Sequence, residues 1–333
     1  MYKRFVPVIL VFCLSFTNFF ETNAFAQTLS DNDQWQVLQK AAIAARALSY
    51  EGIFVYQNGQ QTKSVQITHY FNGQGEFARN VVLDGQPREV FSQGHDLVIF
   101  NPKDEKVIIE KRRGQNMFPG ILPSNLDSIK KNYSLRTGQP ERVAGRSAQM
   151  FFLHPNDSLR YSYKFWIDTE YGLLLKSEMV NSRNEVLEHI GFTQVALMNT
   201  VDLDWFQPKI DSNKSYVMED EVATTIEGDG SSVDWTIKDL PAGYRKVDQM
   251  KRLVHGKPLP VTHMIFSDGL ASVSLFIEPT AKNASKSAPK TTHSVIGNAS
   301  FYTSSNERYV VTAVGEVPEA TVAQIANAVV FSK

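Results

Sequence analysis

The chain has 333 residues, a formal net charge of −1 at pH 7, 42% hydrophobic residues and one cysteine. This length is ample for two domains with cores of their own. The balanced charge excludes the basic footprint that nucleic-acid binding requires. The single cysteine, Cys13, lies in the first segment, so thiol catalysis and cysteine-ligated metals are excluded from the rest of the chain.

Residues 1–26 have the pattern of a removable export signal. Lys3 and Arg4 precede a mostly apolar run over residues 5–20, and Ala24-Phe25-Ala26 supplies the small-x-small pattern of a cleavage site. The run is shorter than the roughly 20 residues that span a bilayer, which disfavours a membrane anchor. We therefore expect cleavage after Ala26, a cysteine-free mature chain, and a location in the bacterial periplasm.

Residues 27–207 are predicted to form the first domain. A helix is expected over 35–48, with Asp33 as its cap, because apolar residues recur there at helical spacing. From Tyr50 onward the pattern favours strands, with a hairpin turn at Asn58-Gly59. Further strands are expected at 96–100, 106–110, 141–153, 160–168, 173–179 and 186–195. Many short strands with few helices indicate a large, curved antiparallel sheet or open barrel. A proline-containing insertion at 114–137, helical near 126–133, is expected to lie across either the mouth or the concave face of the sheet.

A polar, acidic linker is predicted over residues 208–232, with one short strand near 222–226, and a second domain over 233–333. Strands are expected at 235–237, 263–267, 272–278, 291–302 and 309–314. A terminal helix over 318–331 is expected to cover a small antiparallel sheet, in an α+β arrangement, with Thr321 and Gln324 at capping-box spacing.

The sequence contains no recognisable catalytic or metal-binding signature, so we expect no enzyme activity, cofactor or metal. Glu170, Glu178, Glu185 and Glu188 offer carboxylates for glycoside chemistry, but solvated strand faces explain them better. Aromatic residues such as Phe54, Phe151 and Phe165 either line a cavity for acyl chains or fill an ordinary core. The pattern favours the ordinary core.

Several stretches resemble the RseB/MucB family. They are GQPREV (85–90), RYSYKFWIDTEYGLLLKSE (160–178), EVLEHI (185–190), FSDGLASVSLFIE (266–278) and VGEVP (314–318) followed by the terminal helix. The resemblance runs in the same order through nearly the whole mature chain, with the linker in the matching place.

The resemblance implies a periplasmic negative regulator of the sigma-E (AlgU) envelope-stress response. Such a protein binds the periplasmic part of a transmembrane anti-sigma factor (RseA or MucA), shields it from DegS-type site-1 cleavage, and is released by lipid-like signals such as lipopolysaccharide. The resemblance also implies a LolA/LolB-like unclosed barrel packed on helices, a smaller partner-binding domain, and self-association as a homo-oligomer. The alternative function is a periplasmic lipid or lipoprotein carrier of the LolA/LolB type.

The family pattern carries no catalytic residues, so the candidate sites are regions. Candidates for the lipid cavity are Phe54, Phe151, Tyr163, Phe165 and Ile167. Candidates for the partner-binding face are Ser267, Asp268, Gly269, Lys282, Lys286, Lys290 and Arg308. The Asp268-Gly269 pair is equally explained as a hairpin turn.

Overall fold

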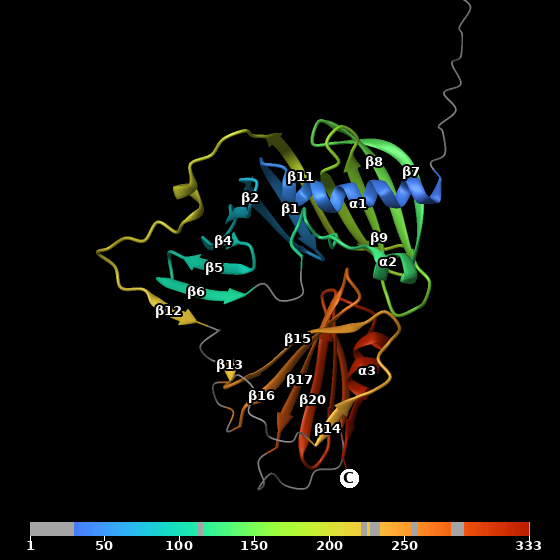
Figure 1. Ribbon diagram of the computed structural model, residues 1–333. Helices are drawn as coiled ribbons and strands as arrows, with labels where there is room; N and C mark the ends of the chain where they lie inside the picture. The colour runs from blue at the N-terminus through green and yellow to red at the C-terminus, as the bar shows by residue number, and fades with distance from the viewer. Residues whose placement is uncertain are drawn as a thin grey trace, which may run out of the picture.

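The structure is a computed structural model that describes residues 30–111, 116–220, 225–226, 234–254, 257, 259–280 and 290–332. The predicted signal peptide lies outside these residues. A large upper unit and a smaller lower unit, each built on its own sheet, meet along one side (Figure 1). No helix in the described part of the chain has the length and apolar character needed to cross a membrane.

The first element is helix α1 (Asp31–Ala47), which lies across one face of the upper sheet (Figure 1). Its N-cap is Ser30, whose hydroxyl accepts a hydrogen bond from the Asp33 backbone N–H. The expectation that Asp33 is the cap was therefore wrong. The acidic residue lies inside the first turn, where it favourably faces the positive end of the helix dipole.

The large sheet has twelve strands in the order β12-β6-β5-β4-β3-β2-β1-β11-β10-β9-β8-β7. Its first and last strands do not pair, so the barrel is unclosed, as expected. The strands are β1 (Tyr50–Asn58), β2 (Gln61–Phe71), β3 (Glu76–Val82), β4 (Glu89–Gln93), β5 (Asp96–Asn101), β6 (Lys106–Lys111), β7 (Tyr133–Val143), β8 (Arg146–Pro155), β9 (Ser162–Asp168), β10 (Leu174–Val180), β11 (Val186–Leu197) and β12 (Val217–Asp220).

The predicted turn between β1 and β2 is confirmed, with Gly59 at φ 57°. The single strand expected over 141–153 is instead a hairpin. It turns at Ala144 and Gly145, which have φ angles of 49° and 80°. Alanine at a positive φ gives no signal in the sequence, because such positions normally carry glycine, asparagine or aspartate.

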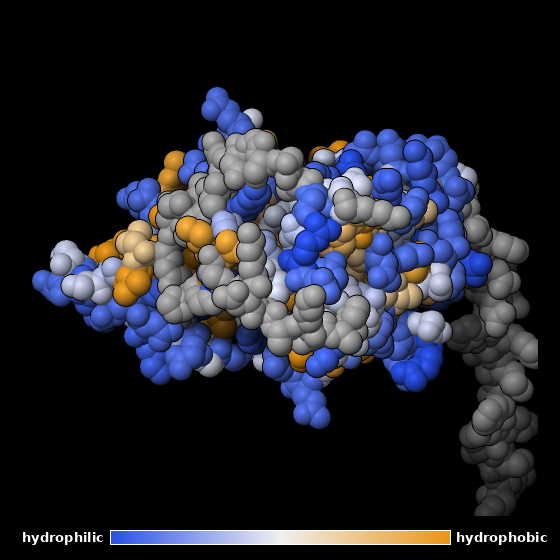
Figure 2. Space-filling view, turned by 90° about the horizontal axis from the view of Figure 1, so that it is seen from below, coloured by the Kyte–Doolittle hydropathy of each residue, from blue (hydrophilic) through white to orange (hydrophobic). Residues whose placement is uncertain are grey.

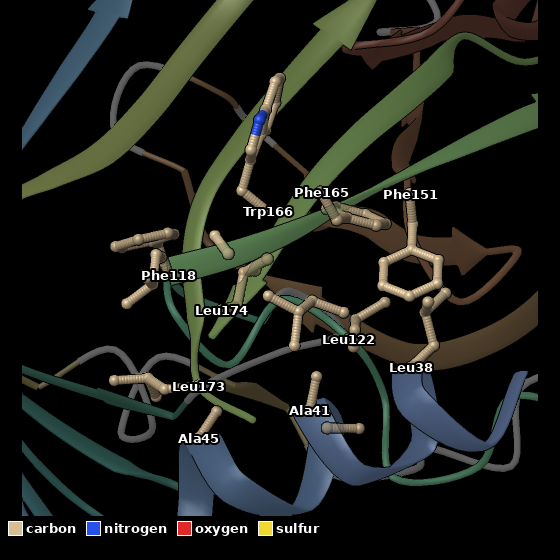
Figure 3. Close-up of a cluster of buried hydrophobic side chains, with 14 of the residues drawn as sticks. Leu38, Ala41, Ala45, Phe118, Leu122, Phe151, Phe165, Trp166, Leu173 and Leu174 are labelled. Carbon is tan, nitrogen blue, oxygen red and sulfur yellow. The ribbon is translucent and has the colours of Figure 1, made fainter. Parts of the chain in front are cut away.

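The insertion carries helix α2 (Asp127–Asn132), and its apolar residues enter the core. Figure 3 shows Phe118 and Leu122 between the side chains of α1 and those of the sheet, as expected of a segment on the inner face. The opposite face of the sheet is partly covered by the 3₁₀ helix η1 (Leu203–Phe206). There, Trp205 donates to Thr68 and lies under the Arg79 guanidinium.

The second sheet has seven strands in the order β13-β15-β16-β17-β20-β19-β18. They are β13 (Thr225–Ile226), β15 (Arg245–Arg252), β16 (Val261–Ser267), β17 (Ser272–Pro279), β18 (Thr291–Ile296), β19 (Ala299–Ser305) and β20 (Tyr309–Gly315). Strand β15 was not predicted, because it alternates polar residues with few apolar ones. The strand expected over 291–302 is a hairpin that turns at Gly297.

The terminal helix is shorter than expected. Helix α3 (Glu319–Asn327) ends before β21 (Val329–Phe331), which pairs with β14 (Trp235–Ile237). The predicted capping box is also wrong. The N-cap is Pro318, and Thr321 lies fully buried inside the helix.

The segment predicted as a linker contributes one strand to each sheet. Strand β12 pairs in parallel with β6 of the first sheet, and β13 pairs with β15 of the second. These strands supply backbone hydrogen bonds along a segment that has few apolar anchors.

Candidate functional site: the seam between the domains

The aromatic residues predicted to line a lipid cavity are packed into the core of the large domain. Phe151 and Phe165 are 0% exposed, and Phe54 and Ile167 are also buried. Tyr163 is half-buried and stacks on Phe165, with ring centroids 5.8 Å apart. Figure 3 shows Phe151 and Phe165 directed toward Leu38 of α1 and Leu122 of the insertion. An acyl chain would enter this space only if α1 or the insertion moved, so the lipid cavity stays a prediction.

The four carboxylates considered for glycoside chemistry do not converge. Glu170, in the β9–β10 turn, pairs with Arg146. Glu178 on β10 faces His189, Lys176 and Lys164, whereas Glu188 lies opposite Met179 and therefore points to the other face of the sheet. Hydrogen bonding to His189, and then to Lys176, lowers the pKa of Glu178 to about 2 against the opposing effect of burial. Glu185 is exposed beside Arg183. Glu178 is therefore a paired structural anion and unsuited to act as a general acid.

The two domains meet along a surface that we call the seam, and its centre is a buried ion pair. Arg160, just before β9, donates from Nε to Oδ2 of Asp268 in the β16–β17 turn at 2.8 Å. Neither side chain is exposed to solvent. The same guanidinium donates to Asp157 and to the backbone carbonyl of Ala242 in the second domain.

Both oxygens of the Asp268 carboxylate accept hydrogen bonds. Oδ2 also accepts from the Tyr133 hydroxyl at 3.2 Å, and Oδ1 accepts from the backbone N–H groups of Leu270 and Ala271, both at 2.9 Å. A buried ion pair is stable only when the remaining polar atoms are satisfied in this way. The pair therefore joins the domains at one defined position.

Aromatic rings enclose the ion pair. The Arg160 guanidinium lies 5.1 Å from the ring centroid of Tyr244, and burial followed by the Asp268 charge raises the pKa of Tyr133 and of Tyr244 well above the usual value. Burial acts to lower the pKa of Arg160, but Asp268 and Asp157 more than offset it, so this pKa is raised. Arg160 therefore stays charged, and both tyrosines stay neutral, across the physiological range.

Two glycines allow the backbones of the domains to approach at the seam. Gly243 has φ 82°, and a Cβ there would lie 2.2 Å from Nδ2 of Asn132 on α2. Gly269 has φ 108°, and a Cβ there would lie 2.9 Å from Oγ of Ser128. Ser128 itself donates to the Asp268 carbonyl at 2.8 Å. The seam thus requires glycine for both its backbone conformation and its close packing.

Helix α3 makes a further contact across the seam. The Thr321 hydroxyl donates to the Leu159 carbonyl at 2.7 Å, next to Arg160. The sequence had suggested a capping role for this threonine, but the tertiary structure uses the hydroxyl to bind the other domain. Beside these contacts lies an open groove between α2 and the second domain, lined by Asp127, Lys131 and Arg245 among others.

The residues predicted for the partner-binding face lie at opposite ends of the second sheet. Ser267, Asp268 and Gly269 belong to the end that faces the large domain, where Asp268 is 1% exposed. Lys290 and Arg308 are exposed at the far end, where Arg308 pairs with Asp234. Lys282 and Lys286 lie outside the described residues. An eight-residue strand separates the two ends by roughly 25 Å, so one short contact cannot include both groups.

Sequence reasoning missed Arg160, Tyr133 and Tyr244 as members of the seam. Arg160 and Asp268 are 108 positions apart, and neither stands in a motif that pairs them. Asp157 lies three residues before Arg160, which is the only local hint of an ion pair there. Within the described part of the chain, no three histidine, cysteine, aspartate or glutamate side chains gather where they could hold a metal ion.

The lower face of the molecule is mostly hydrophilic, with apolar side chains scattered in small groups (Figure 2).

Three features make up the architecture: an unclosed sheet packed on α1, a smaller α+β domain, and a buried ion pair that joins the two domains. These features define a two-domain, mainly β protein.

The chain belongs to the MucB/RseB family. The family's MucB/RseB N-terminal domain matches residues 33–210, and its MucB/RseB C-terminal domain matches residues 229–330. The sigma factor AlgU regulatory protein MucB of Pseudomonas aeruginosa is 29% identical over 304 residues, which cover 90% of this chain and 91% of the relative. The sigma-E factor regulatory protein RseB of Escherichia coli K12 is 26% identical over 299 residues, covering 89% and 90%.

Solved structures agree with the fold. The structure of the Pseudomonas aeruginosa MucA/MucB complex matches with a TM-score of 0.70 at 25% identity, covering 90% of this chain and 99% of the matched chain. A crystal structure of MucB in complex with MucA(peri) matches with a TM-score of 0.69 at 24% identity, covering 91% and 100%. The relatives are named as regulatory proteins, in line with the expectation of a binding protein without enzyme activity.

Proposed function

We propose that this protein acts in the periplasm, binds the periplasmic region of a transmembrane anti-sigma factor, and shields that region from a DegS-type site-1 protease. While the anti-sigma factor stays intact, the sigma factor stays inactive. Lipid-like signals of envelope stress, such as lipopolysaccharide, release the complex. The observation that carries the proposal is the family match over both domains, together with the similarity to MucB in its complex with MucA.

Release by a lipid is a coupling between two binding events. A lipid that binds the free regulator more tightly than the complex lowers the apparent affinity for the anti-sigma segment by the same factor. A coupling of about 1–3 kcal/mol gives a change of roughly 5- to 150-fold. In this chain the aromatic core is filled by α1 and the insertion. Lipid binding there must therefore displace one of them, which would give the lipid a way to favour a different conformation.

The direct test uses the mature chain, residues 27–333, and the periplasmic segment of the anti-sigma factor from the same organism. We expect the segment to bind, its cleavage by the site-1 protease to stop, and both effects to weaken when lipopolysaccharide is added. An exported protein of similar size serves as the control for non-specific protection. Absence of binding at micromolar concentrations would contradict the proposal.

The far end of the second sheet supplies a sharper test of the partner-binding face. Arg308→Glu is expected to weaken anti-sigma binding if this arginine contacts the segment. It also breaks the surface pair with Asp234. The matched control is the swapped pair Asp234→Arg with Arg308→Glu, which restores the internal pair with its charges reversed. Weak binding by both variants supports a direct contact, whereas recovery by the swapped pair assigns Arg308 a structural role.

A periplasmic lipid or lipoprotein carrier remains the second candidate. The unclosed barrel favours it, but the tightly filled core and the family match of the second domain do not. Acyl chains that co-purify with the mature chain and move between vesicles would favour the carrier over the regulator.

A further inference from the structure

A second contact between the domains lies away from Arg160 and Asp268, at the end of the β1–β2 hairpin. Nδ2 of Asn58 donates to Oδ1 of Asn298, in the β18–β19 turn, at 2.7 Å, and lies 3.1 Å from the Tyr56 hydroxyl. Asn298 is 5% exposed. This amide–amide hydrogen bond fixes the position of the hairpin against the second domain.

One carboxylate from each domain flanks this hydrogen bond. Glu188 on β11 lies opposite Asn58 in the sheet register, and Glu316 directly follows β20. Gly315, which precedes Glu316, pairs with Ser300, two residues after Asn298. Glu316 therefore lies beside the turn that carries Asn298, close enough for its charge to act on Glu188. Glu188 is half-buried and Glu316 is more exposed. The contact therefore brings two like charges toward each other when the domains close.

No cation among the described residues pairs with either carboxylate. The groups that face Glu188 are Glu316, the neutral hydroxyl of Tyr56 and the Asn298 amide. The half-buried Tyr163 lies close enough for both charges to act on its hydroxyl. The adjoining strand β10 places Met179 opposite Glu188, while its Lys176 and Glu178, with His189, form a separate charged group on the other face. Lys63, opposite Tyr56 on β2, is exposed.

Partial burial of a carboxyl group and a like charge nearby both disfavour its ionised form. Burial, and next the charge of Glu316, raise the pKa of Glu188 to about 7. When the hairpin leaves the second domain, Glu188 regains solvent and loses the nearby Glu316, so its pKa falls toward the usual 4.3. Closing therefore takes up a proton. The contact is fully stable below the pKa of the open state and weakens as the pH rises through the pKa of the closed state.

We propose that Glu188 and Glu316 make this contact a proton-dependent clamp, which closes the hairpin onto the second domain in mildly acidic conditions and releases it in mildly alkaline conditions. The buried Arg160–Asp268 pair holds the other part of the seam at both extremes. Release of the clamp therefore loosens one end of the seam and leaves the domains joined. The proposal concerns the free protein and does not depend on its partner.

The experiment uses the mature chain, whose lack of cysteine allows two probes to be placed at will. Gln60→Cys on the hairpin and Ile296→Cys on β18 are both at exposed positions, and each is spin-labelled. Dipolar broadening then reports the fraction of closed molecules between pH 5.5 and 8.5. We expect the open-to-closed ratio to rise on the order of tenfold to a hundredfold over this range, with most of the rise below pH 7 and a plateau above it.

Three variants distinguish the clamp from other titrations. Glu188→Gln removes the ionisable group but keeps the shape and a hydrogen-bonding oxygen, so it should stay closed at every pH. Glu316→Gln should lower the pH at which the open-to-closed ratio levels off, because the repelling charge is lost. Glu185→Gln, an exposed change on the same strand connection, should behave like the parent chain. A parent chain that shows no pH dependence, or a Glu188→Gln variant that keeps it, would overturn the proposal.

Discussion

The two contacts that join the domains follow opposite electrostatic designs. At the Arg160–Asp268 contact, opposite charges are buried together and every carboxylate oxygen has donors. At the Asn58–Asn298 contact, two carboxylates approach, and no cation in the described part of the chain pairs with either. The first contact is insensitive to pH in the physiological range, whereas the second depends on protonation. One seam can therefore combine a permanent joint with a conditional one.

The largest expected effect comes from breaking the permanent joint. Asp268→Asn removes the buried partner of the Arg160 guanidinium and leaves it paired only with Asp157, whose side chain is partly exposed. Breaking a buried ion pair by removing one partner typically costs about 3–5 kcal/mol. We expect the free energy of unfolding to fall by about this amount in urea titrations. The control is the double variant Arg160→Met with Asp268→Asn, which also removes the buried guanidinium charge and should recover much of the loss. A loss below about 1 kcal/mol for Asp268→Asn would contradict the assignment of this pair as the central joint.

Substitution of Gly243 at the seam should destabilise the protein nearly as much. Gly243→Ala introduces a Cβ 2.2 Å from Nδ2 of Asn132 and also strains a backbone at φ 82°. We expect a loss of about 2–3 kcal/mol, with faster proteolysis between the domains. Gly145→Ala is the matched control, because Gly145 has φ 80° but nothing within 4 Å of the new Cβ. It should lose only the backbone component, about 1 kcal/mol. Equal losses for Gly243→Ala and Gly145→Ala would show that the close approach of the new Cβ to Asn132 does not contribute to the loss of stability.

The hydrogen bond from α3 should have a smaller effect. Thr321→Val keeps the shape of the side chain but leaves the Leu159 carbonyl without its donor. We expect a loss of about 1–2 kcal/mol, measured by thermal unfolding. Thr312→Val provides a comparison, since the Thr312 hydroxyl bonds to Thr303 on the neighbouring strand of its own domain. Faster interdomain proteolysis should accompany Thr321→Val and be absent from Thr312→Val.

The conditional joint should show the smallest effect, and one that changes with pH. Asn58→Ala removes the amide–amide hydrogen bond, with an expected loss of about 1 kcal/mol at pH 6. At pH 8.5 the loss should shrink, because the ionised carboxylates have already weakened the contact. Unfolding titrations at the two pH values test this difference. An equal loss of stability at both pH values would show that the Asn58–Asn298 hydrogen bond does not depend on the protonation of Glu188.

Local patterns determined much of the fold. The hairpin at Asn58-Gly59, the helix after Ser30 and most strands of the first domain follow from turn chemistry and from apolar spacing. The places where the pattern misled are those where it was locally ambiguous. Ala144 adopts a positive φ without a typical turn residue, and β15 pairs by its backbone while carrying a polar sequence. The sequence also correctly indicated the family and an unclosed sheet on helices.

The sequence predicted only part of the candidate site. The aromatic residues were recognised as apolar, but whether they line a cavity or fill a core depends on α1 and the insertion reaching the same space. The sequence by itself determined the helices, the turns, most strands and the family of this protein, because these depend on residues close together in the chain. Only the tertiary structure decided that Asp268 meets Arg160 and that Glu188 faces Glu316. Such pairs join residues more than a hundred positions apart, and charge or turn type alone does not specify which distant partner each residue meets.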